Sequence, residues 1–266
     1  MSLRLIDASW RAGGRMIVEQ LTLAVEPGRV LALVGPNGSG KSTAVAMLAG
    51  DRAPIAGAAL LDDKPVAGWN WRELARRRTV MRQSASIAFA FTVREIVAMG
   101  RAPHDEGRAV DELAIDAALQ AADIGHLAGR SYMTLSGGER QRAQFARALA
   151  QIGTLRTGNA ARYLLLDEPT ASLDLRHQHD LLHRARALAQ DGVGVLAVLH
   201  DLSLALVYAD DLAVLSGGRL VAVGPVAEVA DPDLLGAVFG VPLARFSAVE
   251  GDGRNSILAV AHSRLA

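Results

Sequence analysis

A glycine-rich segment near the start of the chain has the residue types and spacing of a phosphate cradle. It reads Gly35-Pro36-Asn37-Gly38-Ser39-Gly40-Lys41-Ser42-Thr43 and fits the pattern G-x-x-x-x-G-K-[ST]. Glycines let backbone N–H groups surround a triphosphate without Cβ clashes, and a helix that begins at Lys41 aims its positive end at the anion. Lys41 would then balance the charge of the β- and γ-phosphates, and the Ser42 hydroxyl could bind Mg²⁺.

Lysine is rare in this chain, which sets Lys41 apart. The only lysines are Lys41 and Lys64, and arginine supplies the other strongly basic side chains. An ammonium is compact, whereas a guanidinium is planar and broad. We therefore interpret Lys41 as a residue that the chemistry of the cradle requires. A plain glycine-rich turn is the alternative, but an apolar strand before the loop and a helix after it favour the cradle.

Two adjacent carboxylates follow an apolar strand later in the chain. The run 163–166 is Tyr-Leu-Leu-Leu, and Asp167 and Glu168 come directly after it. Strands of a parallel sheet present their carboxyl ends to ligands. We therefore expect Asp167 to hold Mg²⁺ through its water shell, and Glu168 to polarise the attacking water as a general base. Many core strands end in Asp, so this assignment depends on its pairing with the cradle.

A second helix start has the features of an anion site. Ser136 and Glu139 have the spacing of a capping box, which predicts that a helix begins here. Gly137 and Gly138 leave the first N–H groups of that helix uncovered. An ordinary serine-capped helix is the alternative, and the physics of the segment alone does not exclude it.

The elements around these residues predict an α/β fold. Residues 3–33 are typical of strands with turns, and a helix is expected from Lys41 to Ala49 with Gly50 at its end. From 163 onward strands and helices alternate, which indicates a mainly parallel sheet with helices on its faces. The segment 211–224 predicts a hairpin turned by Gly217-Gly218, and the tail 240–266 is strand-like.

The intervening block, 84–150, is mostly helical in pattern. We therefore predict one domain over 1–266, built as a P-loop NTPase core with an antiparallel β subdomain and an inserted α-helical subdomain. The nucleotide-binding core would comprise 1–83 and 151–266, and the helical subdomain 84–150 would carry the helix start at Ser136.

The composition restricts the function classes. Half of the residues are hydrophobic, the formal net charge is zero and cysteine is absent. These values allow a sizeable core, exclude disulfides and thiolate metal sites, and give no basic face for nucleic acid. No run approaches the 18 apolar residues of a membrane span, and the first residues lack the apolar core of a signal peptide. We expect a protein that is soluble or peripheral to a membrane.

In combination, the motifs resemble the full set of the ABC ATPase family, in the family's order, over about residues 5–225. The set is the loop 35–43, LSGGERQ at 135–141, LLLDEP at 164–169, Ser172-Leu173-Asp174 and a lone His200 after a strand. The resemblance implies ATP and Mg²⁺ as ligands. It also implies that two copies dock head to tail, with ATP between one copy's 35–43 loop and the other's 136–138 helix start.

The resemblance also implies roles for single residues. Gln83 matches the glutamine that links the Mg²⁺ and water site to the membrane partner, and it would help to bind the metal. His200 matches the histidine that contacts the γ-phosphate. Trp10 stands where the family places an aromatic residue, usually Tyr, that stacks on adenine. Glu139 and Asp174 would belong to the shared nucleotide site.

Two segments narrow the kind of transporter. Residues 88–104 and 167–182 are similar to importers of iron chelates, cobalamin and haem, and the lengthened loop 152–162 resembles the haem-import ATPases; a tolerated surface insertion is the alternative for that loop. The resemblance implies an ATPase subunit of a binding-protein-dependent importer, with haem ahead of a siderophore or cobalamin. Its partners would be two transmembrane permease subunits and, indirectly, a periplasmic binding protein, at the cytoplasmic face of a bacterial inner membrane.

Two other classes are weighed against the transporter. A soluble ABC-type ATPase acting on nucleic acid or ribosomes usually has two cassettes, coiled-coil arms or basic extensions, and this chain has one cassette, no heptads and no net charge. A nucleotide-binding regulator without turnover would not need both Glu168 and His200.

Three histidines share one predicted helix, and a metal or haem site is one interpretation of them. His179 and His183 would lie on one helix face. Leu181, Leu182, Ala185 and Leu188 look like the core side of that helix, however, and no third ligand is evident. We therefore interpret His177, His179 and His183 as a solvated helix face.

Overall fold

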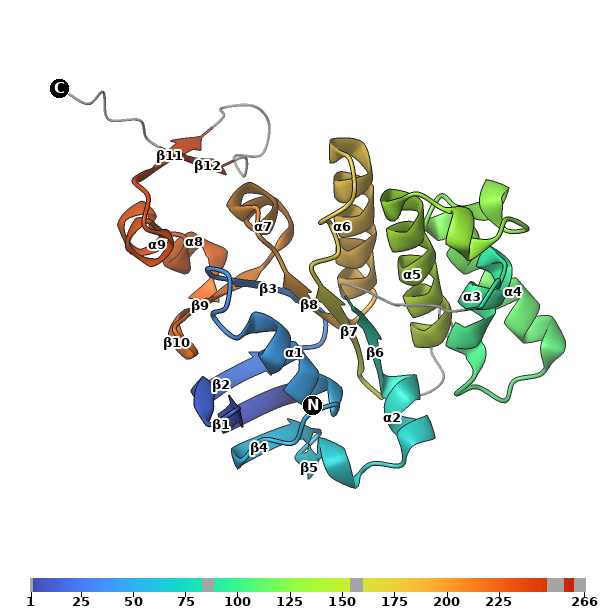
Figure 1. The fold of residues 1–266 in the computed structure, drawn as a ribbon, viewed down its shortest axis with the longest axis horizontal. Helices are drawn as coiled ribbons and strands as arrows, with labels where there is room; N and C mark the ends of the chain where they lie inside the picture. Colours follow the sequence, from blue (N-terminus) through green and yellow to red (C-terminus); the bar gives the residue numbers. More distant parts are fainter. Residues whose placement is uncertain (1, 83–88, 154–159, 248–255, 261–266) are drawn as a thin grey trace.

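The computed structural model describes residues 2–82, 89–153, 160–247 and 256–260 (Figure 1). Gln83 and most of the loop 152–162 therefore lie outside the described residues. None of the helices in these ranges is both long and apolar enough to cross a membrane.

A six-stranded sheet forms the centre of the molecule. Its order is β10-β9-β3-β8-β7-β6, and all neighbours are parallel except β9 and β10. The strands are β3 (Val30–Val34), β6 (Arg78–Met81), β7 (Arg162–Asp167), β8 (Val193–Val198), β9 (Asp211–Ser216) and β10 (Arg219–Pro225). Every residue of β3 and β8 is buried, as expected for strands covered on both faces.

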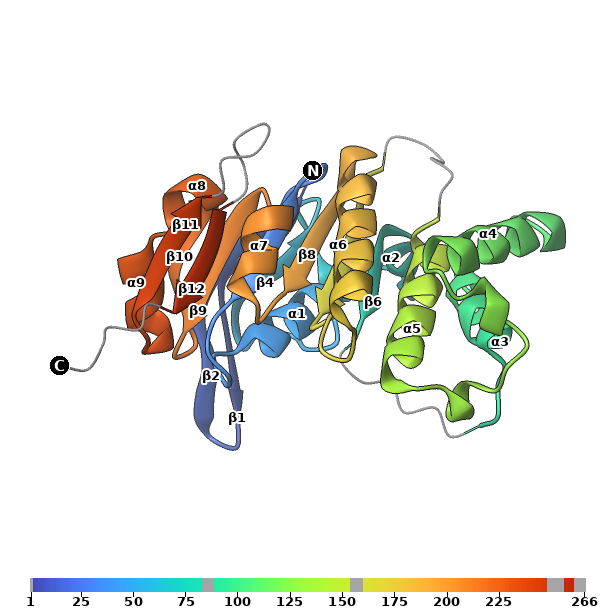
Figure 2. The same ribbon diagram turned by 90° about the horizontal axis from the view of Figure 1, so that it is seen from above.

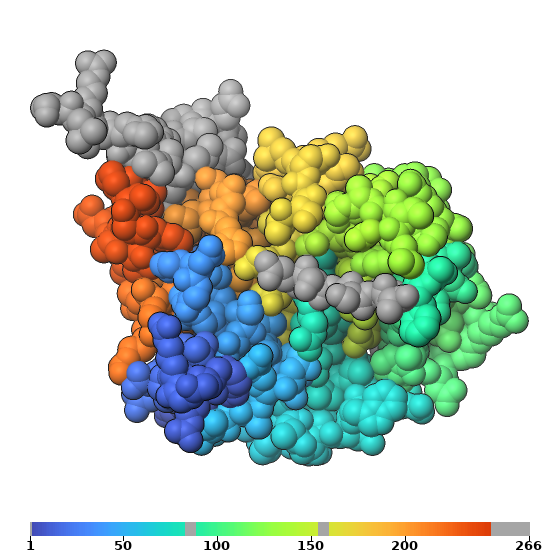
Figure 3. All heavy atoms as spheres, in the orientation of Figure 1, coloured from blue at the N-terminus to red at the C-terminus, as the bar shows by residue number. Residues whose placement is uncertain are grey.

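A smaller antiparallel sheet packs beside the N-terminal part of this core. Its order is β2-β1-β4-β5. The strands are β1 (Leu3–Ala12), β2 (Arg15–Val25), β4 (Ala56–Leu61) and β5 (Lys64–Pro65). Helix α1 (Lys41–Ala49) lies between the two sheets, and its buried side chains join those of Leu31, Leu33, Leu165 and Leu196 in one apolar cluster. On the face shown in Figure 3, residues 30–60 lie between the N-terminal strands and the helices at 175–208.

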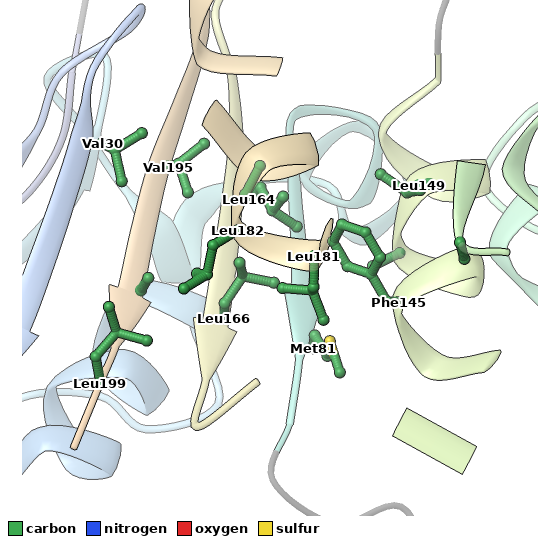
Figure 4. Close-up of a cluster of buried hydrophobic side chains, with 14 of the residues drawn as sticks. Val30, Met81, Phe145, Leu149, Leu164, Leu166, Leu181, Leu182, Val195 and Leu199 are labelled. Carbon is green, nitrogen blue, oxygen red and sulfur yellow. The ribbon is translucent and has the colours of Figure 1, made fainter. Parts of the chain in front are cut away.

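The opposite face of the central sheet carries the long helices. These are α5 (Gly137–Ile152) and α6 (Leu175–Gln190), and the short helix α7 (Leu202–Tyr208) packs against α6. Phe145 and Leu149 of α5 and Leu181 and Leu182 of α6 point toward the strand residue Leu164 and its neighbours (Figure 4). Burial of each such side chain stabilises the fold by about 1.5–3 kcal/mol. This cluster fixes where α5 begins relative to the sheet.

The remaining helices occur in two groups. The helices α3 (Val93–Ala98) and α4 (Arg108–Ala121) come between β6 and β7 in sequence and lie with α5 beside the sheet, far from β9 and β10 (Figure 2). Apart from short 3-10 helices, the other elements of the described residues are α2 (Trp71–Arg77), α8 (Val226–Val229), α9 (Pro232–Phe239), and the hairpin of β11 (Leu243–Ser247) and β12 (Ser256–Val260).

The predicted fold class is confirmed: a mainly parallel sheet, helices on both faces, an antiparallel sheet and an added group of helices. The helix 41–49, its left-handed Gly50 and the hairpin at Gly217-Gly218 are also confirmed. The division at 83/84 and 150/151 stays a prediction.

Two of the three histidines of α6 differ from the expected solvated face. His183 is exposed, but His177 and His179 are half-buried: the Nδ1 of His177 lies 2.7 Å from Asp174 Oδ1, and the Nδ1 of His179 lies 2.8 Å from the Tyr208 hydroxyl of α7. The helix α7 packs against α6, and this contact takes His179 out of solvent. Within the described ranges, no group of three or more His, Asp or Glu residues is arranged to hold a metal ion.

Candidate functional site

The glycine-rich loop connects β3 to α1 and leaves the first turn of α1 open. Gly40 is the N-cap in a left-handed conformation, it provides no side-chain cap, and the first turn has no acidic residue. The first N–H groups of α1 are therefore without the usual side-chain acceptor, and the positive end of the helix is not neutralised. Such a start favours binding of an anion.

Two of the loop glycines are required by close backbone approaches. A Cβ at Gly35 would lie 2.0 Å from the carbonyl oxygen of Leu215, and one at Gly40 would lie 2.9 Å from that of Ile17. Both also have positive φ, 151° and 103°. Any larger residue would have to displace strands β9 or β2, so these positions accept only glycine without rearrangement.

Lys41 lies under the loop. It is only 5% exposed, and its Nζ donates to the carbonyl oxygens of Gly35 at 2.8 Å and Pro36 at 3.0 Å. Burial lowers the pKa of Lys41, and the nearby carboxylates of Glu168 and Asp167 act in the opposite direction. The ammonium is thus held beside the cradle by exchangeable carbonyl contacts, which phosphate oxygens could replace.

A cavity of about 490 Å³ lies over the loop, within the size range of small-molecule sites. Asn37 to Thr43 form its floor and Glu168 closes one side. The remaining walls, which the sequence analysis did not identify, come from Arg15, Met16 and Ile17 of β2 and from the turn Gly217-Gly218. Of these walls, the sequence predicted only that Gly217-Gly218 turns a hairpin. The turn is tied to the loop because Gly218 N–H donates to the Ser39 carbonyl at 3.1 Å.

Two of the three predicted metal ligands, Ser42 and Asp167, lie together although 125 residues separate them, and the third, Gln83, lies outside the described residues. The Ser42 hydroxyl donates to Asp167 Oδ1 at 3.1 Å. Asp167 ends β7 and is 9% exposed; burial raises its pKa, while the hydrogen bond from Ser42 lowers it. A hydroxyl and a carboxylate beside a phosphate cradle form the hard oxygen pair that suits Mg²⁺.

The two residues expected to act on water and the γ-phosphate are in contact. His200 Nε2 lies 2.8 Å from Glu168 Oε1. Glu168 follows β7 and His200 lies just beyond the end of the neighbouring strand β8, so the parallel register brings them together. Glu168 also has a left-handed backbone, with φ 52°, which is uncommon for a non-glycine residue.

The second predicted anion site is located elsewhere on the chain. The capping box is confirmed: Glu139 N–H donates to Ser136 Oγ at 3.3 Å and Ser136 N–H donates to Glu139 Oε2 at 2.7 Å. A Cβ on Gly138 would lie 3.0 Å from the Ser172 carbonyl, so the helix start is backed by that loop. None of the residues 136–139 lines the cavity over Lys41.

The last predicted residues have other contacts in this structure. Asp174 is the N-cap of α6 and accepts the N–H of His177, which together with the His177 ring lowers its pKa. The ring of Trp10 is covered by the Arg52 guanidinium, 4.1 Å from the ring centroid, and it does not line the cavity. Stacking of adenine on that face of Trp10 would require Arg52 to move aside.

The sequence of the chain is similar to those of known proteins. Residues 18–171 match the family described as ABC transporter. The hemin import ATP-binding protein HmuV of Pseudomonas fluorescens Pf-5 is 48% identical over 239 residues, or 90% of this chain and 92% of the relative. The protein of the same name from Myxococcus xanthus DK1622 is 49% identical over 259 residues, or 96% and 94% of the two chains.

The fold is also found in a solved transporter. A chain from a protein described as a metal-chelate type ABC transporter, in an inward-facing conformation, superposes with a TM-score of 0.81. It is 26% identical, and the match covers 100% of this chain and 99% of that chain.

Proposed function

The chain belongs to the ABC transporter family of ATP-binding subunits, and from this premise we propose that it hydrolyses ATP to drive import of haem across a bacterial inner membrane. The observation that carries the proposal is that the Lys41 loop, Ser42 and Glu168 line one cavity, while Asp167 is bonded to Ser42 and His200 contacts Glu168.

The hydrolytic step can be assigned to residues of this chain. The open N–H groups of α1 and the Lys41 ammonium would hold the β- and γ-phosphates. Glu168 would accept a proton from the attacking water with the carboxylate oxygen that His200 does not contact. With its proton on Nε2, His200 donates to Oε1 of Glu168 and so orients that carboxylate.

Mg²⁺ is part of the proposal because its predicted ligands fit it. Ser42 and Asp167 would hold the ion, with Gln83 as a further ligand, and the bound ion would neutralise charge on the transferred phosphoryl group. Because Asp167 is buried, an ion bound to it would lie close to the phosphates and away from solvent.

A second copy of the chain is the first proposed partner. The cavity over Lys41 lacks any residue of the segment 136–139, although that segment is a helix start with an exposed glycine, Gly137. Head-to-tail docking would place the Ser136 segment of one copy, with its Glu139 and Asp174, over the nucleotide of the other. The division into a core, 1–83 and 151–266, and a helical unit, 84–150, belongs to this proposal.

Two permease subunits and, indirectly, a periplasmic binding protein complete the proposed assembly at the cytoplasmic face. Haem is proposed as cargo because the relatives at 48% and 49% identity are hemin import proteins. A ferric siderophore or cobalamin is the second candidate cargo, because the solved transporter is described as being of the metal-chelate type.

The test is coupled hydrolysis in the assembled transporter. The chain is co-expressed with candidate permeases, the complex is placed in lipid vesicles, and ATP hydrolysis is measured with a binding protein loaded with haem, ferric siderophore or cobalamin. We expect stimulation by the haem-loaded protein and none in the Glu168→Gln complex. Stimulation by another cargo alone would replace haem, and absence of hydrolysis in every assembly would contradict the ATPase itself.

A further inference from the structure

The backbone at Glu168 needs support that the β7 strand does not give. The strand ends at Asp167, and the chain turns at once into the left-handed conformation at Glu168. A non-glycine residue in that conformation is held only where its surroundings over-determine it. One supporting contact is local, since the Ala171 N–H approaches the Glu168 carbonyl oxygen at 3.4 Å.

The stronger contact comes from another helix. Gln141, on the second turn of α5, donates from Nε2 to the Glu168 carbonyl oxygen at 3.1 Å. The side chain is only 8% exposed, so this amide has been taken out of water to make the bond. Loss of a buried partner would leave the carbonyl less satisfied and the turn less constrained.

The position of Gln141 connects two parts of the proposed reaction. It lies on α5 just after Gly137 and Gly138, the segment expected to face the nucleotide of a second copy. The Gln141 amide is bonded to Glu168, and the carboxylate of Glu168 lies 2.8 Å from His200. Since α5 comes from the group of helices beside the sheet, the bond joins that group to the end of β7 (Figure 1).

We propose that Gln141 is a positioning residue for hydrolysis. Its amide donates to the Glu168 carbonyl and so fixes the turn that orients the Glu168 carboxylate toward water. The orientation of that carboxylate therefore depends on the position of α5. The inference rests on the proposed ATPase function and adds a residue to it. Gln141 does not line the cavity over Lys41 and acts through Glu168.

The same helix offers a matched control. Gln144 is also buried, at 5% exposure, and its Nε2 donates to the Tyr132 hydroxyl at 2.9 Å, within the helices beside the sheet. Gln144 makes no contact with Glu168 in the described bonds. Replacing either glutamine with methionine keeps the length of the side chain and removes one buried amide that donates a hydrogen bond.

The experiment compares Gln141→Met, Gln144→Met and the wild type in steady-state ATP hydrolysis and in dimer formation with MgATP. We expect Gln141→Met to lower kcat by about 10- to 100-fold, the scale of a misplaced catalytic group, with KM for ATP changed by less than about twofold. Because ATP still binds, the variant should accumulate an ATP-bound dimer. Gln144→Met should keep kcat, and thermal melting should show whether both variants fold.

Three outcomes would overturn the proposal. Equal kcat losses in the two variants would show only a structural role, and an unchanged kcat in Gln141→Met would show no role. Loss of the ATP-bound dimer together with kcat would assign the effect to docking of α5. A wild-type protein that does not hydrolyse ATP would instead refute the proposed function, and the role of Gln141 with it. A third variant, Gln141→Glu, has no amide donor and places a charge against the carbonyl, so it should be no more active than Gln141→Met.

Discussion

The starts of α1 and α5 both contain glycine, Gly40 just before α1 and Gly137 and Gly138 as the first residues of α5, but they are completed in different ways. At α1 the N-cap is Gly40, no side chain caps the first turn, and the open donors face a cavity beside Lys41. At α5 the Ser136 hydroxyl takes the N–H of Glu139, and the Glu139 carboxylate brings a negative charge to the same turn. The start of α1 is therefore a nearly complete anion site. At the start of α5, by contrast, side chains of the same segment already accept some of the N–H groups.

The difference indicates what each helix start can do alone. An uncapped turn with a buried ammonium can bind a triphosphate within one chain. A capped turn with a carboxylate binds an anion weakly, and it is suited to add contacts to a phosphate that another copy already holds. The variants below test this comparison, beginning with the largest expected effect.

The first prediction removes the charge at α1. Lys41→Ala should abolish turnover, because loss of one preorganised group costs about 10²–10³-fold and ATP affinity falls as well. Lys41→Arg should also fail, since a guanidinium does not fit the space beneath the Gly35 and Pro36 carbonyls. Steady-state phosphate release and nucleotide binding measure both. Wild-type activity in Lys41→Arg would contradict the role given to Lys41 in the anion site at α1.

The second prediction separates the two carboxylates beside α1. Glu168→Gln should slow hydrolysis by about 10²–10⁴-fold while ATP still binds, so an ATP-bound dimer should accumulate. Asp167→Asn should instead weaken Mg²⁺-dependent binding and give little dimer. Size-exclusion chromatography with MgATP, beside phosphate-release assays, distinguishes the two. If Asp167→Asn dimerises and Glu168→Gln elutes as a monomer, the assigned roles are wrong.

The third prediction concerns the start of α5. Ser136→Arg should leave nucleotide binding to the monomer within about twofold, because no residue of 136–139 lines the cavity, and should block ATP-dependent dimerisation. Mixing this variant with Lys41→Ala subunits should restore at most one intact site per dimer. Light scattering with MgATP makes the measurement, and a normal dimer would refute the role given to Ser136.

The fourth prediction sharpens the contrast with a smaller change. Ser136→Ala removes the cap of α5 and should lower the free energy of unfolding by about 1 kcal/mol. An equivalent cap does not exist at α1, so Gly40→Ser should fail for a different reason, its Cβ meeting Val18 and Ile17. Chemical denaturation of both variants is the test; a fully stable Gly40→Ser protein would contradict the packing described here.

Much of the site was predictable because its chemistry depends on local sequence patterns. The cradle at 35–43, the capping box at 136 and the carboxylates after β7 each come from a contiguous run, and the structure contains each of them. The parts that the sequence did not reveal are made by distant segments. The Met16 wall and the Gln141–Glu168 bond depend on how β2 and α5 pack, and no local pattern specifies that packing.

The same reasoning explains why the surroundings of Trp10 and His179 differed from expectation. Trp10 matched a position in a family pattern, but Arg52 follows α1 in sequence and reaches the ring only in the folded chain. The spacing of His179 along its helix predicted a solvent-exposed side chain. The residue that buries it, Tyr208, is on a helix that begins 23 residues later. Periodicity predicts a face of a helix and does not identify what covers it.

The scarcity of lysine has a practical consequence for chemical labelling. Lys64 is exposed and lies over the Trp69 ring, whereas Lys41 is almost wholly buried beneath the carbonyls of the loop. An amine-reactive reagent should therefore modify Lys64 readily and Lys41 slowly. Because the chain has no third lysine, peptide mapping of the Lys41 adduct, with and without added nucleotide, would report occupancy of the cradle through a single side chain, with Lys64 as an internal standard in the same molecule.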